Sequence, residues 1–367
     1  MIFAGSMLWA QGPDQDSQWV DGIWNIDRGQ VRRLQADHAS VTPTVTGYAI
    51  PGMVDVHCHL GIGDEGPVGQ DEQRQHALDT LRSGVLAIRD CGVPVDNSWM
   101  KTDALAPILI HSGRHLARPK RYLRDLPIEA TSQRDLPILV AEQAKNSDGW
   151  VKIIGDWIDR SNGVDSDLDP LWDRKVVIDA VAAAHDEGAR VAVHSFSHRA
   201  IDDLLDAGVD DIEHGSGMDA DQLNQAVRQG VLVDPTLLQV QRFKDFAAQA
   251  GAKYPVYAAT MRQMYEHRRE HFGLLVDSGV ELVLGTDSGG FQRHGTVFKE
   301  LAMWQEWGMA PSRIVDVATW RTRRAMGLPA LYEGATADLV ILQEDPRRDI
   351  QAIAGPRTVV LSGCVID

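Results

Sequence analysis

The chain has 367 residues, of which 44% are hydrophobic and 24% are charged, an ordinary balance for a folded globular protein. Its formal net charge is −16, which argues against a nucleic-acid partner because backbone phosphates would be repelled. No apolar run reaches the ~20 residues that a membrane span requires. The first Lys or Arg in the sequence is Arg28, so we expect no signal peptide.

Three cysteines, Cys58, Cys91 and Cys364, lie far apart in the sequence and fit no disulfide framework. Free thiols are typical of proteins in a reducing compartment. We therefore expect a cytoplasmic protein.

Short strand-like segments occur at both ends of the chain. The stretch QWVDGIWNIDRGQVRRL (18–34) predicts two strands around a turn at Asp27 to Gly29. The last residues, ADLVILQEDPRRDIQAIAGPRTVVLSGCVID, are rich in strand-forming residues again. We expect residues 1–50 and 330–367 to form one small β domain from both termini.

The middle of the chain alternates between strand-like and helical segments. The segments that favour strands are residues 54–60, 84–90, 106–112, 150–156, 190–196, 210–215, 231–238 and 280–289. The clearest helical pattern has Asp169 as a natural N-cap, Pro170 at the first helical position and Gly188 at the exit. Eight alternating units favour an α/β fold, a closed (β/α)8 TIM barrel over residues 51–329, more than an open sheet.

Chemically distinctive side chains occur on five of these strands. In VDVHCHL (54–60), His57 and His59 are two positions apart, so on a strand they face one side and Cys58 the other. The other four are Lys152 in VKII, His194 in VAVHSF, His214 in IEHG and Asp287 in LGTDSG. Because strand carboxyl ends meet at one rim of a barrel, we expect these side chains to gather there. Four histidines and a carboxylate are a ligand set for a divalent metal.

Lys152 is unusual because a charged lysine is costly inside an apolar strand. A neutral amine can react with carbon dioxide to give a carbamate, an anionic ligand able to bridge two metals. Taken singly, each residue has an ordinary structural explanation, such as a hydrogen-bonded histidine, a Lys152–Asp156 ion pair or a turn at Asp287. Their joint occurrence at five strand ends favours a metal site.

The motifs DVHCH, VK, VH, EHG and GTDSG, in that order, and the terminal GATADLVIL resemble those of the amidohydrolase superfamily of metal-dependent hydrolases. The resemblance covers nearly the whole chain and implies a distorted barrel that carries a small β-sandwich. With a lysine on the fourth strand, the chain is similar to the binuclear subgroup, nearest to its prolidase-like and imidazolonepropionase-like branch.

The resemblance implies a role for each ligand. His57, His59 and Asp287 would bind the more buried of two divalent ions, with zinc expected. His194 and His214 would bind the other ion, and a carboxylated Lys152 would bridge both. A hydroxide shared by the metals would attack a C–N bond of an amide-like group of a small molecule, such as a dipeptide. Asp287 would accept its proton and pass it to the leaving nitrogen. The same site could open an ester or lactone.

Three alternatives stay open. A mononuclear deaminase or cyclic-imide hydrolase of the same superfamily usually lacks the lysine on the fourth strand. A non-catalytic binding protein typically loses ligands. The sequence HRREH (267–271) matches an inverted zinc-protease motif, but it lies before the eighth strand, where a barrel requires a connecting helix.

A basic loop after the third strand should lie on the catalytic rim. The segment GRHLARPKRYLRDL (113–126) contains the substrate-binding candidates Arg114, Arg118 and Tyr122, and a guanidinium there could hold a substrate carboxylate. The alternatives for this loop are a solvated surface or a contact in a homo-oligomer. His294, which follows the eighth strand, is a further candidate to touch substrate, with packing as its alternative.

Overall fold

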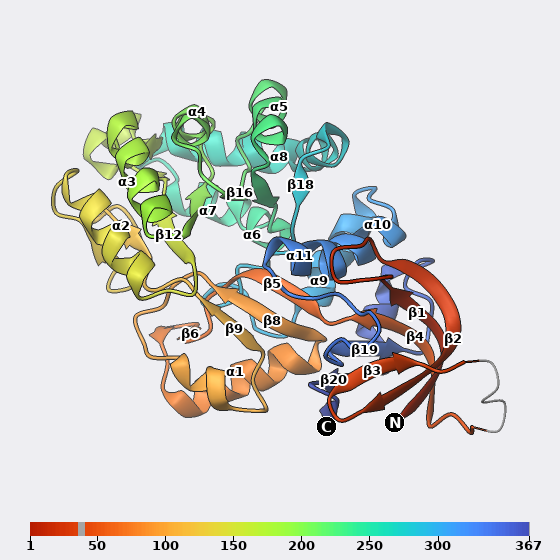
Figure 1. Ribbon diagram of the computed structural model, residues 1–367. Helices are drawn as coiled ribbons and strands as arrows, with labels where there is room; N and C mark the ends of the chain where they lie inside the picture. The colour runs from red at the N-terminus through yellow and green to blue at the C-terminus, as the bar shows by residue number, and fades with distance from the viewer. Residues whose placement is uncertain (36–40, 367) are drawn as a thin grey trace.

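The computed structural model describes residues 1–35 and 41–366 and has an α/β fold (Figure 1). Residues 36–40, which belong to the small β domain predicted above, lie outside the described residues. Among the helices of the described residues, none has the length and apolar character that crossing a membrane requires.

Both ends of the chain contribute strands to one seven-stranded sheet. In spatial order its strands are β21 (Cys364–Ile366), β20 (Arg357–Leu361), β19 (Leu339–Leu342), β4 (Val45–Pro51), β1 (Ile2–Trp9), β2 (Gln18–Asp27) and β3 (Gln30–Arg33). β19 pairs antiparallel with β4, and this pairing joins the C-terminal strands to the N-terminal ones. The boundaries proposed for a separate domain, 1–50 and 330–367, stay a prediction.

The eight strand segments expected in the middle of the chain are all present, and their ladders are parallel. One sheet contains β5 (Met53–Cys58), β8 (Val85–Asp90) and β9 (Ile108–His111). The other contains, in order, β11 (Ile128–Glu129), β10 (Leu116–Ala117), β12 (Trp150–Ile154), β15 (Arg190–Ser195), β16 (Asp211–His214), β17 (Leu232–Asp234) and β18 (Glu281–Leu282). Val56 N donates to Leu284 O at 2.8 Å, and His59 N donates to Ser288 O at 2.7 Å. These bonds connect the segment after β18 to β5, as in a distorted (β/α)8 barrel.

Helices alternate with these strands, and α3, α4 and α5 lie outside β12 and β16 in Figure 1. The helices are α1 (Gln70–Arg82), α2 (Asp135–Lys145), α3 (Arg174–Asp186), α4 (His198–Ala207), α5 (Ala220–Gln229), α6 (Leu237–Val240), α7 (Phe243–Ala250), α8 (Pro255–Ser278), α9 (Val297–Glu306), α10 (Pro311–Asp316) and α11 (Thr322–Ala325). Short hairpins are made by β6 (Ile62–Gly63) with β7 (Gly66–Pro67) and by β13 (Asp156–Ile158) with β14 (Leu168–Pro170). The HRREH motif lies within α8, so the expected connecting helix is confirmed.

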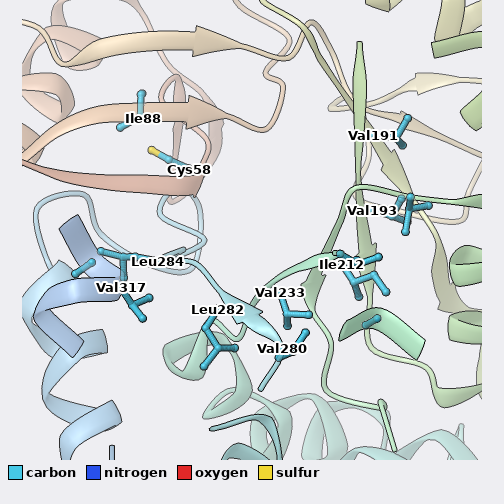
Figure 2. Close-up of a cluster of buried hydrophobic side chains, with 14 of the residues drawn as sticks. Cys58, Ile88, Val191, Val193, Ile212, Val233, Val280, Leu282, Leu284 and Val317 are labelled. Carbon is cyan, nitrogen blue, oxygen red and sulfur yellow. The ribbon is translucent and has the colours of Figure 1, made fainter. Parts of the chain in front are cut away.

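Strand alternation separates two sets of buried side chains. Val191, Val193 and Ile212 belong to the large apolar cluster that the strands share with the covering helices, and Figure 2 shows them together with residues of other strands. The alternate positions, such as Ala192 and Leu232, belong to a different cluster in the barrel interior. The inward positions of each strand therefore determine what lines the barrel.

The helix predicted to begin at Asp169 begins later. Asp169 and Pro170 lie in β14, and α3 starts at Arg174. The predicted N-cap was wrong because β14 pairs with β13, a tertiary interaction that overrides the local capping signal. The expected exit is confirmed, since Gly188 follows α3 with a left-handed φ of 77°.

The eighth strand is shorter than the predicted segment 280–289, because the chain beyond β18 bonds to β5 instead. Asp287 N donates to His57 O at 2.7 Å. Gly285 permits this approach, since a Cβ there would lie 2.5 Å from Oδ1 of Asp234 and 2.8 Å from Cβ of His57. The missing side chain therefore lets the segment bring Asp287 beside His57.

Candidate metal centre and catalytic site

The predicted histidine and aspartate ligands meet at the carboxyl ends of the parallel strands. Oδ1 of Asp287 lies 3.2 Å from Nε2 of His57 and 3.4 Å from Nε2 of His59. Nε2 of His214 lies 3.0 Å from Nδ1 of His194. Ligand atoms of His57, His214 and Asp287 all lie within 4.8 Å of one another. These distances are short enough for the side chains to share bound metal.

β5 directs both of its histidines inward through a break in register. Val56 already faces the interior cluster, so strict alternation would send His57 outward. The pairing of β5 with β8 shifts between Asp55 and Cys58. Both imidazoles therefore reach the site, while Cys58 lies in the outer apolar cluster as expected (Figure 2).

His214 reaches the interior through an unusual backbone conformation. Its φ is 66°, a left-handed value that is uncommon for a residue other than glycine. Asp287 has a similar φ of 55°. Because of the turn at His214, both His214 and the preceding Glu213 face the barrel interior, as their contacts with His194 and Lys152 demonstrate. Such strained residues are concentrated at functional sites.

A second layer of hydrogen bonds fixes the orientation of three of the imidazoles. The partner of Nδ1 is Oδ1 of Asp234 for His57 (2.9 Å), the carbonyl of Gly92 for His59 (3.1 Å) and the hydroxyl of Thr236 for His214 (2.6 Å). Nε2 of each ring is left to face the centre. Metal-binding histidines are oriented in this way, with one ring nitrogen bonded to the protein and the other to the ion.

The protonation states also suit a metal. Burial and the neighbouring Lys152 lower the pKa of His57 to about 3. Burial lowers the pKa values of His194 and His214 well below the ordinary value. Burial alone would raise the pKa of Asp287, but its interactions with His57 and His59 hold it well below the usual range. Neutral imidazoles and an ionised carboxylate are the forms that bind divalent ions.

Lys152 points into the same interior from β12 and is buried. Its Nζ is in direct contact with Oε2 of Glu213, and burial lowers the pKa of the amine. Asp156, the partner considered from the sequence, instead accepts hydrogen bonds from Oγ of Ser195 and N of Ser197. The apolar VKII segment therefore does carry an inward lysine, but its partner comes from β16.

Further ionisable residues below the ligands were not predicted from the sequence. Nη2 of Arg89 donates to Oδ2 of Asp211 at 2.6 Å and lies 3.4 Å from Oε1 of Glu213. The same oxygen of Glu213 accepts a hydrogen bond from Sγ of Cys91 at 3.1 Å. Ligand atoms of His57, Cys91 and Glu213 also lie within 4.8 Å of one another. The sequence signal that could have identified Arg89 and Glu213 is a charged residue inside an apolar strand, which is the signal that identified Lys152.

A cavity of about 340 Å³ opens over the ligands, and we call it the catalytic cavity. Its floor includes His59, His194 and Asp287, and its walls include Tyr122, Trp157 and Phe291. Charged side chains at Asp64, Glu65, Arg124 and Asp125 also line it. The site therefore has room for a small molecule that touches the ligands directly.

The basic loop contributes Tyr122 to this cavity rather than the predicted arginines. Nε of Arg114 donates to the carbonyl of Leu126 at 2.6 Å, and its Nη2 donates to that of Asp125 at 2.8 Å. Within the described part of the chain, neither Arg114 nor Arg118 lines the catalytic cavity. Arg114 thus holds the loop that presents Tyr122, and a role for either arginine in binding substrate stays a prediction.

His294 lies one cavity away from the predicted substrate site. Its ring stacks on that of His76 with centroids 4.3 Å apart, and its Nδ1 lies 3.8 Å from Sγ of Cys58. Both histidines line a cavity that adjoins the catalytic cavity at residues 62–67. These are packing contacts, and a role for His294 in binding substrate stays a prediction.

His115 lines the catalytic cavity and was not singled out from the sequence. Its Nδ1 donates to the carbonyl of Gly92 at 3.0 Å, the same carbonyl that His59 uses. Burial lowers its pKa well below the usual value, so the ring is neutral. Among residues 1–35 and 41–366, Nε2 of His115 has no hydrogen-bond partner. It is a buried acceptor on the cavity wall.

Comparison with known proteins identifies the family. The model of the Amidohydrolase family matches residues 48–365. The chain belongs to the amidohydrolase family. It is 41% identical over 343 residues to an uncharacterised protein of Mycobacterium tuberculosis, covering 93% of this chain and 90% of that one. This amidohydrolase is therefore an enzyme, a hydrolase acting on carbon–nitrogen bonds, as the sequence motifs predicted.

Solved structures support the fold. An Xaa-Pro dipeptidase with bound methionine has a TM-score of 0.80 and 22% identity, covering 99% of this chain and 98% of that chain. The ochratoxinase of A. niger has a TM-score of 0.78 and 18% identity, covering 100% and 95% of the two chains. At such identities the likeness concerns the fold, and the predicted α/β barrel with a small β domain is confirmed.

Proposed function

We propose that this amidohydrolase is a binuclear metal-dependent enzyme that cleaves the amide bond of a small molecule. The observation that carries the proposal is the convergence of ligand atoms from β5, β15, β16 and the segment after β18, with three imidazoles oriented by partners of their own. His57, His59 and Asp287 would hold one ion and His194 and His214 the other, with a carboxylated Lys152 between them. Zinc suits this mixture of imidazole and carboxylate ligands.

The ions, when bound, would supply a hydroxide near neutral pH and polarise the substrate carbonyl. Asp287 is ionised, so it can accept the proton of the nucleophile and return it to the leaving nitrogen. Burial raises the pKa of Tyr122, so its phenol stays protonated and can donate to the substrate carbonyl.

One contact favours a second candidate, a mononuclear deaminase or cyclic-imide hydrolase. Nζ of Lys152 touches the carboxylate of Glu213, and an ammonium paired in this way would need no second ion. In that enzyme Lys152 would be structural, and His57, His59 and Asp287 would suffice for catalysis with one ion.

Metal analysis of protein prepared without chelator, combined with a hydrolysis screen, tests the proposal. The screen would contain N-acyl amino acids, dipeptides and lactones. We expect up to two ions per chain and hydrolysis of an amide. A fully active protein with a single ion would support the mononuclear candidate instead.

Substitution of Lys152 separates the two candidates further. Lys152→Ala should lose most activity and weaken binding of the second ion, and short carboxylic acids should restore part of both. Lys145→Ala is the matched control, because Lys145 is exposed and its Nζ lies 3.3 Å from Oε1 of Glu187, away from the metal ligands. Lys152→Ala that lacks activity but keeps its metal content and shows no rescue would contradict the bridging role.

A further inference from the structure

A second cavity adjoins the catalytic cavity, and its lining is mostly aromatic and apolar. It has a volume of about 280 Å³, and we call it the aromatic groove. Residues that line the groove alone include Ile158, Phe246, Ala250, Tyr254 and Tyr257, and the polar side chains on it are Arg160 and Gln249. The groove lies between β13 and the helices α7 and α8, outside the metal ligands.

The two cavities share three wall residues, Leu123, Trp157 and Phe291. The ring of Trp157 lies 5.5 Å from that of His194, so this wall begins directly beside the ligands. The groove and the catalytic cavity therefore adjoin at these three side chains, so the groove is the neighbouring space into which a substituent of an amide at the metal centre would extend past Trp157.

Phe291 and Leu123 are exposed large apolar side chains at this junction. Phe291 is 48% exposed and Leu123 is 37% exposed. Phe291 lies on a tight turn closed by a hydrogen bond from Gly289 N to Gln292 O of 2.8 Å. Its ring is 5.9 Å from that of Phe246. Contiguous apolar surface of this kind, fixed in place next to a cavity, is typical of a site that a ligand covers.

Charged side chains also line the catalytic cavity. Asp64, Glu65 and Asp125 line it together with Arg124. An apolar substituent gains nothing there, because it would remove charged groups from water without replacing their hydrogen bonds. The difference between the linings of the two cavities favours an orientation of the substrate with its apolar part toward Trp157, Phe291 and the aromatic groove.

We propose, on the basis of the amide hydrolysis argued above, that the enzyme prefers amides that carry a large aromatic substituent, which occupies the aromatic groove. Trp157, Phe246 and Phe291 would contact its ring edge to face and determine specificity. Arg160 is the charged residue among those that line the groove in the described ranges, and the remaining lining is largely aromatic and aliphatic, which favours an apolar group.

Matched substrates test this preference. One series is N-methylacetamide, N-benzylacetamide and N-(naphthylmethyl)acetamide, and a second is the N-methylamides of acetic, phenylacetic and naphthylacetic acid. The methylene in each aryl member keeps the reactivity of the amide similar. We expect kcat/KM to rise roughly 10- to 100-fold from methyl to naphthylmethyl in at least one series, as burial of an aromatic group predicts. Equal values throughout both series would overturn the proposal.

Variants and a binding measurement locate the effect. Phe246→Ala should reduce the aryl-to-methyl ratio of kcat/KM by about tenfold. Phe298→Ala is the control, since Phe298 is also partly buried but lies on α9 and packs against the main core instead. Calorimetric titration with 2-naphthylmethanol should give weaker binding to Phe246→Ala than to the wild type or to Phe298→Ala. Equal binding by all three would overturn the groove assignment.

The two proposals fail in distinguishable ways. If the metal-loaded enzyme cleaves no amide but binds 2-naphthylmethanol with loss in Phe246→Ala, the proposed function fails and the groove stands as an aromatic site. If it cleaves amides without regard to the aryl group, the proposed function stands and the substrate preference is wrong.

Discussion

The two ends of the barrel interior have opposite chemistry although the same strands build both. Toward the amino ends of the strands, most inward side chains are apolar and form a cluster that includes Val56, Trp150, Ala192 and Leu232, with the paired charges of Arg89 and Asp211 beside it. Toward the carboxyl ends, the inward side chains are ionisable and buried. On β12, β15 and β17 the change takes place within two residues, from Trp150 to Lys152, from Ala192 to His194 and from Leu232 to Asp234.

The difference indicates that the apolar end of the barrel interior contributes mainly to stability and the ionisable end mainly to catalysis. Apolar inward residues gain free energy from burial, whereas buried charges cost free energy unless they are paired. A protein keeps such charges where function requires them. Substitutions at the carboxyl end should therefore change catalysis and metal binding, and substitutions at the apolar end should change the free energy of unfolding.

The largest effect on catalysis is expected for Asp287→Asn. The amide keeps the shape of the side chain and a weak ligand oxygen, but it cannot accept a proton. Because general acid–base catalysis contributes ~10²–10⁴-fold, kcat should fall by at least that order while metal content changes little. The acidic limb of the pH–rate profile should also disappear, since the carboxylate that must be ionised is gone.

Near-normal kcat in Asp287→Asn with metals in place would contradict this role. Asp287 would then be a ligand only, and another group would have to move the proton. His115 is a neutral imidazole among the residues that line the catalytic cavity, whereas His294 lines the neighbouring cavity. If His115 is that group, His115→Gln should lower kcat in the same assay.

Leu232→Ala tests the apolar end. Leu232 is buried in the interior cluster, and a Leu→Ala change at such a position costs about 2–5 kcal/mol in the free energy of unfolding. Chemical denaturation should detect the loss, while kcat of the folded, metal-loaded variant stays at the wild-type value. A drop in kcat without a loss of stability would remove the distinction between the two ends.

Asp234→Ala, two residues further along β17, should show the reverse. It removes the carboxylate that accepts the hydrogen bond from Nδ1 of His57, so His57 loses its orientation. Loss of such a partner lowers metal affinity by about 10- to 100-fold. Competition with a chelator measures this, and Asp234→Asn, which keeps an acceptor oxygen, should lose less. Equal affinities for wild type and both variants would show that His57 needs no orienting partner.

The strands and the ligands could be predicted from the sequence because each has a local signal. Apolar segments with β-branched residues marked the eight strands, and ligands such as His57, Lys152 and Asp287 interrupted them with polar groups. Because eight such strands alternate with helices, the sequence predicted a barrel, and the ligands near the carboxyl ends of its strands were therefore expected at one rim. The terminal sheet was foreseen for the same reason, since its strands are apolar segments at both ends.

What could not be predicted depends on partners that are distant in sequence. Asp169 has the local signal of an N-cap, but β14 pairs with β13 and delays the helix. Strand alternation would direct only one of the neighbours Glu213 and His214 inward, and the left-handed φ of His214 turns both inward. The basic loop shows its charge in the sequence, but not that Arg114 bonds to carbonyls of its own loop.

The smallest effect concerns a buried carboxylate outside the barrel interior. Glu300 on α9 accepts hydrogen bonds from N of Leu237 (2.6 Å), N of Leu238 (2.8 Å) and Nε1 of Trp304 (2.7 Å). Burial nevertheless raises its pKa from 4.5 to about 7. Glu300 is a buried carboxyl group with a structural role, so it tests whether every such group behaves like those at the metal centre.

Glu300→Gln should therefore change the pH dependence of stability and leave kcat unaffected. Between pH 4.5 and 7 the folded protein holds a proton on Glu300 that the unfolded chain has released, so wild-type stability is present at low pH and declines as pH rises through this window. The decline is about 1.4 kcal/mol per pH unit at most. The amide of Gln does not titrate, so the unfolding free energy of wild type relative to the variant should decrease from pH 5 to 7.

Glu306→Gln, exposed on the same helix, controls for the loss of one carboxylate. Parallel stability curves for wild type and Glu300→Gln would show that Glu300 is ionised in the folded protein, and that its three N–H donors outweigh burial.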